Sequence, residues 1–190
     1  MQRLDTRKLA LASILGALAA ASEVIKGPPF DIPFPLRPPG TTISWDLTGV
    51  PMMMSLLFSG PIAAVYTCFI GCSIIFLNGN VSGGIFKLVA ELVTILAFAA
   101  LRKGVVVKSV VAVASRVLIM TAVNFYLLQF FYRTPESVVV GTYLLPVAVL
   151  NLTQALLNII PAYIIYSRLG DWWRLRGQET KPLEPVPIKT

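Results

Sequence analysis

Residues 27–61 read GPPFDIPFPLRPPGTTISWDLTGVPMMMSLLFSGP, and the two halves of this stretch carry the strongest clue to the architecture. The first half is too rich in proline for a helix or a paired sheet, because proline lacks the amide donor that both need. The second half, Leu47 to Phe58, is an apolar run well short of the roughly 20 residues that cross a bilayer core. Irregular backbone at membrane depth must be covered by protein or line a cavity. We therefore expect a long outer loop and a short helix that together form the lid and wall of a ligand site.

The composition of the whole chain is that of an integral membrane protein. Of its 190 residues, 56% are hydrophobic and 13% are charged, and the mean hydropathy is +0.76. Soluble domains carry about 25% charged residues. The formal net charge of +7 would suggest nucleic-acid binding in a soluble protein, but here membrane topology explains it better. The length fits one transmembrane domain at 1–168, followed by an interfacial and disordered cytoplasmic tail at 169–190.

The apolar segments predict an all-α integral membrane bundle of six helices with a short second helix. Besides the short helix, the sequence predicts helices at about 9–25, 62–77, 85–101, 105–131 and 142–167. A polar turn at 78–84 and a loop at 132–141 are expected to connect the later helices. An even number of crossings puts both termini on the same side of the membrane.

The distribution of lysine and arginine orients this bundle. With both termini in the cytoplasm, most cations lie inside, and only Lys26, Arg37 and Arg133 lie outside. The same orientation brings the proline-rich loop, the turn at 78–84 and the loop at 132–141 together on the outer side. The expected cavity therefore opens outward.

Amide side chains in the later helices are candidate ligand contacts. Asn151, Gln154 and Asn158 share one helix face through their i, i+3, i+7 spacing, and Asn124 projects from the outer half of the preceding helix. Amides offer donors and acceptors to a neutral ligand without adding charge. Hydrogen bonding between helices is their alternative role.

Ionisable residues inside a membrane are costly and are therefore functional candidates. Lys87 and Glu91 are four residues apart and can pair on one helix face, either as a structural ion pair or as ligand contacts. Arg116 lies at mid-depth and needs a partner, and Glu23 lies near the outer end of the first helix. Asp46 is expected to cap the short helix or to contact the ligand.

One side of the first helix consists of unusually small residues. Ala12 and Gly16, and also Ser13 and Ala17, follow the small-xxx-small pattern that lets a second helix approach closely in lipid. The pattern by itself is compatible with packing inside the bundle and with a docking face for a partner membrane subunit.

Missing residues and motifs argue against several kinds of chemistry. Histidine is absent, and Cys68 and Cys72 lack further metal ligands, so we expect the cysteines to be small packing residues. Gly79 and Gly84 have the spacing of a phosphate-binding loop, but Ile85 follows where that motif requires lysine. No GxSxG or HExxH motif occurs. We therefore expect no catalytic residue, metal or cofactor in the chain.

Five segments resemble a known family of membrane proteins. RKLALASILGA at 7–17, ISWDLTGVP at 43–51 and FSGP at 58–61 resemble the substrate-binding S components of energy-coupling factor (ECF) vitamin transporters. SRVLIMTAVNF at 115–125 and LNLTQALLN at 150–158 look most like the riboflavin-specific subfamily. The resemblance extends over about residues 7–168.

The resemblance implies a role and partners. It implies a six-helix bundle in the cell membrane that captures riboflavin or a flavin-like vitamin from outside, together with a transmembrane coupling subunit and two ABC-type ATPases. It also implies that the small-residue face of the first helix docks the coupling subunit, with Ser13 and Ala17, or Ala12 and Gly16, in the matching positions. Catalysis would then occur in the ATPases and not in this chain.

The resemblance further implies the ligand contacts. It maps two flavin-binding asparagines onto Asn124 and Asn151, and a flavin-binding lysine onto Gln154, while the loop at 28–42 would close over the bound ligand. Gln154 departs from that lysine, and Gly49 stands where an acidic residue is common before the proline.

Other functions remain open at this point. The ligand could be another small vitamin or a nucleobase-like molecule. The chain could also be a small membrane enzyme that uses Lys87, Glu91 and Arg116, or a structural subunit without a ligand.

Overall fold

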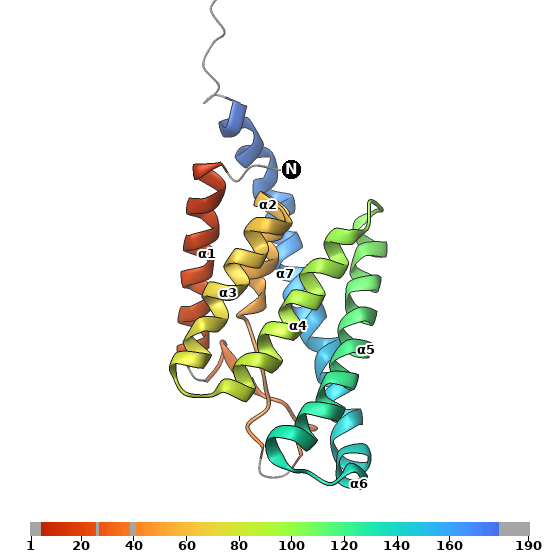
Figure 1. Ribbon diagram of the computed structural model, residues 1–190. Coiled ribbons are helices and arrows are strands. Elements are labelled where there is room, and N and C mark those ends of the chain that lie inside the picture. The colour runs from red at the N-terminus through yellow and green to blue at the C-terminus, as the bar shows by residue number, and fades with distance from the viewer. Residues whose placement is uncertain (1–4, 26, 39–40, 179–190) are drawn as a thin grey trace, which may run out of the picture.

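The computed structural model is a bundle of helices with one small β-ribbon at one end (Figure 1). It describes residues 5–25, 27–38 and 41–178, with the backbone alone for 171–178. In chain order the elements are α1 (Thr6–Val24), β1 (Asp31–Pro33), β2 (Ser44–Asp46), α2 (Gly49–Ser59), α3 (Pro61–Leu77), α4 (Val81–Ala100), α5 (Val105–Tyr132), α6 (Glu136–Val138), the π-helix η1 (Val139–Tyr143) and α7 (Leu144–Gln178).

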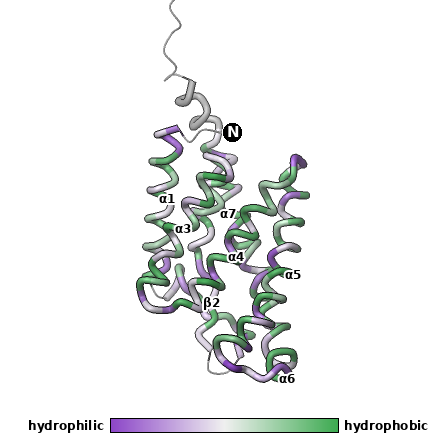
Figure 2. Tube along the Cα trace, in the orientation of Figure 1, coloured by the Kyte–Doolittle hydropathy of each residue, from purple (hydrophilic) through white to green (hydrophobic). Residues whose placement is uncertain are grey.

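The helices confirm the predicted all-α membrane class. By length and composition, α4, α5 and the continuous helical segment at 136–170 can each cross a membrane. The predicted short helix is α2, an apolar helix of 11 residues, and α3 is an apolar helix of 17 residues. Hydrophobic residues run along most of the helical length, whereas hydrophilic residues gather at the connection between α4 and α5 and around α6 (Figure 2).

The predicted outer segments lie at one end of the bundle. The β-ribbon, the α3–α4 turn and α6 are together at the end opposite to the start of α1 and the end of α7 (Figure 1). Because α2 is short, it stays within the bundle, where it packs against α1, α3, α4 and α7. The hydrophobic core surrounds it and includes Met52, Met53, Ile95 and Phe98.

The two cysteines lie in this core, in the packing role that the sequence predicts. Cys68 and Cys72 are both buried among apolar side chains. The Sγ atom of Cys68 lies 3.6 Å from the Sδ atom of Met52. Soft sulfur side chains of this kind fill irregular gaps between helices.

The prediction that the proline-rich half forms no paired sheet is wrong. β1 and β2 pair as antiparallel strands, with Pro33 opposite Ser44. The amide of Phe34 donates to the carbonyl of Ile43 at 3.1 Å, and hydrogen-bonded pairs alternate with non-hydrogen-bonded pairs in such a ribbon. Pro33 therefore occupies a non-hydrogen-bonded position, where its missing N–H costs nothing.

Three predicted boundaries also move. The polar turn at 78–84 is shorter than expected, because α4 already begins at Val81 and the Asn80 side chain caps it by accepting from the amide of Gly83 at 2.9 Å.

Most of the predicted loop at 132–141 is helical, in α6 and η1, after a left-handed residue at Arg133. α7 continues past the predicted helix end at 167 to Gln178, and residues 179–190 of the predicted tail lie outside the described residues.

The small residues of α1 fall on two different sides of the helix. Ala12 and Gly16 are buried, and the Ala12 carbonyl accepts a hydrogen bond from Thr67 of α3 at 3.1 Å. A Cβ added to Gly16 would lie 2.8 Å from the Cβ of Ile70. This pair therefore serves packing inside the bundle, and its alternative assignment to an exposed docking face is corrected. Ser13 is partly exposed, with its hydroxyl bonded to the carbonyl of Leu9 in the same helix, and Ala17 is exposed.

The close approach of α1 and α3 at Gly16 generates a stability prediction. We expect Gly16→Ala to lower the free energy of unfolding by about 1–3 kcal/mol, because Ile70 or the helices must shift to admit the methyl group. Thermal unfolding of the purified protein in detergent measures this change. Gly141→Ala, at an exposed position within η1, is the matched control, since nothing lies within 4 Å of a Cβ there, and equal melting temperatures for the two variants would contradict the prediction.

Candidate ligand-binding site

A cavity of about 510 Å³ lies at the end of the bundle that carries the β-ribbon. Its volume is within the range of small-molecule pockets, roughly 300–1,000 Å³. The segment before α2, the two helices α4 and α5, and the η1–α7 helix all contribute to its walls. The lining residues are Thr41, Thr42, Ile43, Ser44, Asp46, Asn80, Gly83, Phe86, Lys87, Ala90, Arg116, Met120, Asn124, Leu128, Tyr132, Thr134, Tyr143, Val147, Leu150, Asn151 and Gln154.

One face of α5 forms a continuous wall of this cavity. Arg116, Met120, Asn124, Leu128 and Tyr132 follow each other at intervals of four residues, and all of them line the cavity. The stripe extends over about 24 Å at 1.5 Å per residue, from the C-terminal end of α5 to the middle of the bundle. Arg116 therefore marks the deep end of the cavity and Tyr132 its mouth.

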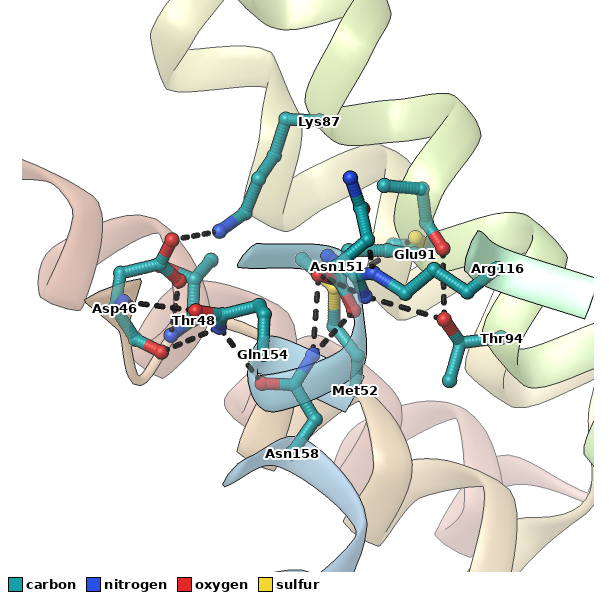
Figure 3. A network of polar contacts seen from close by, with 12 residues as sticks. Asp46, Thr48, Met52, Lys87, Glu91, Thr94, Arg116, Asn151, Gln154 and Asn158 are labelled. Atoms are coloured by element: carbon teal, nitrogen blue, oxygen red, sulfur yellow. Dashed lines mark hydrogen bonds and ion pairs between the residues drawn. The ribbon is translucent and has the colours of Figure 1, made fainter. Parts of the chain in front are cut away.

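A buried ion pair closes the deep end. The Nη1 atom of Arg116 donates to the carboxylate of Glu91 at 3.0 Å and to the hydroxyl of Thr94 at 3.1 Å, and its Nε atom donates to the amide oxygen of Asn151 at 3.1 Å (Figure 3). The exposed fractions of the Arg116 and Glu91 side chains are 4% and 0%. The predicted need of Arg116 for a partner is confirmed, and the partner is the carboxylate of Glu91.

Asn158 lies behind the cavity, where it bonds to the same carboxylate. Its amide nitrogen donates to both oxygens of Glu91, at 3.1 and 2.9 Å. Gly49 makes room for this amide, because a Cβ at that position would lie 1.9 Å from the Asn158 nitrogen. Neither Glu91 nor Asn158 lines the cavity. Their prediction as ligand contacts is therefore corrected to a supporting role behind Arg116.

Lys87 does not form the predicted pair with Glu91. Its ammonium group bonds to the carboxylate of Asp46, and it lies 4.0 Å from a carboxylate oxygen of Glu23 (Figure 3). The hydroxyl of Thr48 also donates to Glu23, at 2.9 Å. Lys87 thus connects α4 to the ribbon and to α1. Sequence spacing could not reveal this, because both partners are distant in the chain.

Asp46 lines the cavity and is not the N-cap of the short helix. It ends β2, whereas α2 begins at Gly49 with Thr48 as its N-cap residue. The carboxylate of Asp46 accepts from the amide of Thr48 at 3.0 Å, which closes a turn before the helix. Burial opposes the charge of Asp46 and is the largest single influence, but the adjacent Lys87 ammonium and the hydrogen bonds from Lys87 and Thr48 together hold the pKa of the carboxyl below its ordinary value.

Gln154 holds the ribbon against α7. Its side chain donates to the carbonyl of Asp46 at 2.7 Å and accepts from the amide of Asp46 at 3.2 Å. The indole of Trp45 donates to the hydroxyl of Thr153 at 2.8 Å, and the ring of Phe34 packs edge-on against Trp45 at 5.2 Å. β2 is therefore fixed to α7 next to the cavity, and β1 is held through its pairing with β2.

Sequence reasoning missed Trp45, Thr153 and Thr94 as parts of this site. Only Trp45 carried a usable signal, since a partly buried indole needs a hydrogen-bond acceptor. Of the predicted ligand contacts, Asp46, Lys87, Asn124, Asn151 and Gln154 do line one cavity.

The sequence matches no family model and no curated protein, but the structure resembles a solved one. That structure is described as the S component of a bacterial ECF transporter. It aligns with a TM-score of 0.70 over 87% of this chain and 96% of the other, at 19% sequence identity. The two proteins therefore share their fold.

The buried ion pair at the deep end generates a second stability prediction. We expect Glu91→Leu to lower the free energy of unfolding by about 3–5 kcal/mol, because the Arg116 guanidinium loses its buried counter-charge. The double variant Glu91→Leu/Arg116→Leu should regain part of that loss. A double-mutant cycle, followed by chemical denaturation in mixed micelles, measures the coupling, and additive effects would contradict it.

Proposed function

We propose that this chain is the S component of an ECF-type transporter and that it captures riboflavin or a flavin-like vitamin. The observation that carries the proposal is a cavity of about 510 Å³ within this fold, into which Asn124, Asn151 and Gln154 all project. The resemblance of Asn124 and Asn151 to two flavin contacts of the riboflavin subfamily supports the choice of ligand. The apolar side chains of the cavity wall, among them Phe86 and Met120, can pack against a flat aromatic ring.

In this proposal the cavity faces the outside of the cell. The bias of lysine and arginine favours cytoplasmic termini in the cell membrane. The cavity mouth is at the opposite end from the start of α1, so ligand enters from the outer side. The segment between β1 and β2 contributes Thr41, Thr42 and Ile43 to the mouth, and its movement would cover the ligand. The ribbon itself stays fixed through Trp45 and Gln154.

The proposed partners are a transmembrane coupling subunit and two ABC-type ATPases. The outward side of α1, with Ser13 and Ala17, is the proposed docking face, because small residues let a partner helix approach closely in lipid. ATP hydrolysis in the partners would reorient the loaded bundle and release ligand inside. The chain itself then performs no covalent chemistry.

A different neutral vitamin is the second candidate ligand. Two positions favour it: Gln154 replaces the lysine of the riboflavin subfamily, and Gly49 replaces an acidic residue that is common there. In this chain Gln154 bonds to the backbone of Asp46, and Glu91 supplies the carboxylate beside Asn158. An enzyme that uses Lys87, Glu91 and Arg116 is less well supported, since all three side chains are engaged in ion pairs.

Riboflavin binding by the purified protein tests the proposed ligand. We expect binding without ATP, seen as quenching of flavin fluorescence. Asn151→Ala/Gln154→Ala should weaken binding about 100-fold, because each lost hydrogen bond costs roughly tenfold. Leu152→Ala/Leu156→Ala, on the exposed side of the same helix, is the matched control and should leave affinity unchanged. Unchanged affinity in the amide variant would rule out this pocket.

The docking face has a separate test. We expect Ala17→Trp to leave riboflavin binding intact but to abolish vitamin uptake by cells that contain the coupling subunit and ATPases, because the indole holds the partner helix away. Leu118→Trp is the control, since Leu118 is exposed on α5 and its side chain is 70% accessible. Normal uptake in the Ala17 variant would show that another face docks the partner.

A further inference from the structure

We propose that Arg116 recognises an uncharged hydrogen-bond acceptor, such as a ring carbonyl, at the deep edge of the ligand. Glu91 is the positioning residue that fixes the Arg116 guanidinium for this contact. The inference deepens the proposed function, on which it rests for the choice of riboflavin as the first probe. It concerns residues other than the three amides that the family resemblance assigns to the ligand.

The donors of Arg116 are only partly used within the protein. A guanidinium has five N–H groups. The Nε group donates to Asn151, and the Nη1 group donates to Glu91 and Thr94. Among the residues that the structure describes, no acceptor bonds to Nη2. Among the described residues, only the Ser59 hydroxyl is a fully buried polar side-chain atom without a partner. The unbonded Nη2 atom is therefore not fully buried. Since Arg116 lines the cavity, the N–H groups of Nη2 are open to that space.

The direction of these free donors is fixed. Glu91 is fully buried and is held by Arg116 on one side and by the Asn158 amide on the other (Figure 3). Asn151 holds the Nε side of the same planar group. Because a guanidinium is rigid and planar, bonds at Nε and Nη1 also set the position of Nη2. Donors that are already oriented bind an acceptor without a further ordering cost.

The charges around the cavity favour an uncharged acceptor. Lys87 and Arg116 are the cations of the network, and Glu23, Asp46 and Glu91 are its carboxylates. If all are ionised, these five groups sum to −1. The charge of Arg116 is thus already compensated, and an anionic ligand would gain little from it. A neutral carbonyl still gains a charge-assisted hydrogen bond, which is stronger than one between neutral groups.

The distribution of lining residues orients the ligand. Apolar side chains, among them Met120, Val147 and Leu150, lie between Arg116 and the mouth. Hydroxyl and amide groups gather at the mouth, on Thr41, Thr42, Asn80, Tyr132 and Thr134. A ligand with a carbonyl-bearing aromatic ring and a hydrophilic chain therefore fits with the carbonyl edge inward and the chain outward. Riboflavin has this shape, since its ring carries two carbonyls and its chain is a polyol.

The test compares ligands that differ in one acceptor. Equilibrium dialysis of the purified full-length protein measures affinity for riboflavin and for its 2-thio and 4-thio analogues, in which sulfur is a weaker acceptor than oxygen. We expect one of the analogues to bind about 10- to 100-fold more weakly than riboflavin. In Arg116→Lys this discrimination should fall to about twofold or less, since lysine keeps the charge opposite Glu91 but loses the planar donor pair.

Two further variants separate a positioning role from a structural one. Glu91→Gln should reduce the discrimination between riboflavin and the sensitive analogue severalfold, because the guanidinium is held less firmly. A residue that only stabilised the fold would weaken all three ligands equally. Arg102→Lys, at an exposed position after α4, is the matched control and should discriminate like the unaltered protein.

The possible results distinguish this inference from the proposed function. Riboflavin binding with undiminished discrimination in Arg116→Lys would overturn the role of Arg116 and leave riboflavin capture intact. If riboflavin does not bind, lumazine and uracil serve as neutral probes with a two-carbonyl edge. Their Arg116-dependent binding would support the inference and overturn the riboflavin assignment. Failure of all neutral probes, or tighter binding of the anion orotate than of uracil, would overturn the inference.

Discussion

The buried ion pair between Arg116 and Glu91 is the interaction on which the arrangement of the site depends. A guanidinium at the middle of a membrane bundle is costly unless a carboxylate and further acceptors surround it. Glu91 and Thr94 come from α4, Asn151 from α7 and Arg116 from α5, so the ion pair and the hydrogen bonds of Arg116 fix three helices to each other. It also sets the deep end of the cavity, because the cation cannot move without losing its partners.

The short helix α2 provides the space for this arrangement. α2 begins at Gly49, inside the bundle. The residues before it, in β2, can therefore lie along the wall of the cavity. Gly49 has no side chain, which lets Asn158 reach the carboxylate of Glu91. Lys87 then joins α4 to the ribbon through Asp46. The polar network and the segment before α2 therefore stabilise each other. The segment supplies the Asp46 carboxylate to Lys87, and the Gln154 side chain bonds to backbone groups of the segment that lipid could not satisfy.

Much of the fold could be predicted, because apolar length and turn residues are local properties. The helix limits agree with the sequence to within a few residues for α1, α2, α3 and α5. The errors have local causes too. Prolines such as Pro33 argue against strand pairing, but Pro33 lies at a position of the ribbon where no backbone N–H donor is needed. In the site, the spacing of Asn151 and Gln154 correctly placed both on one cavity wall. The pairing of Lys87 with Glu91 failed because each found a closer partner on another element.

The order of residues predicts the membrane class, the short second helix, the gathering of the connecting segments at one end and the set of polar residues inside the bundle. These follow from hydropathy, length and cationic bias, which need no knowledge of contacts. Contacts between helices establish which of those polar residues face the cavity and which lie behind it. It turned Ala12 and Gly16 inward, and it set Glu91 and Asn158 behind Arg116. The physical reason is that a buried charge takes the best-placed partner in space, and spacing along one helix does not reveal partners on the others.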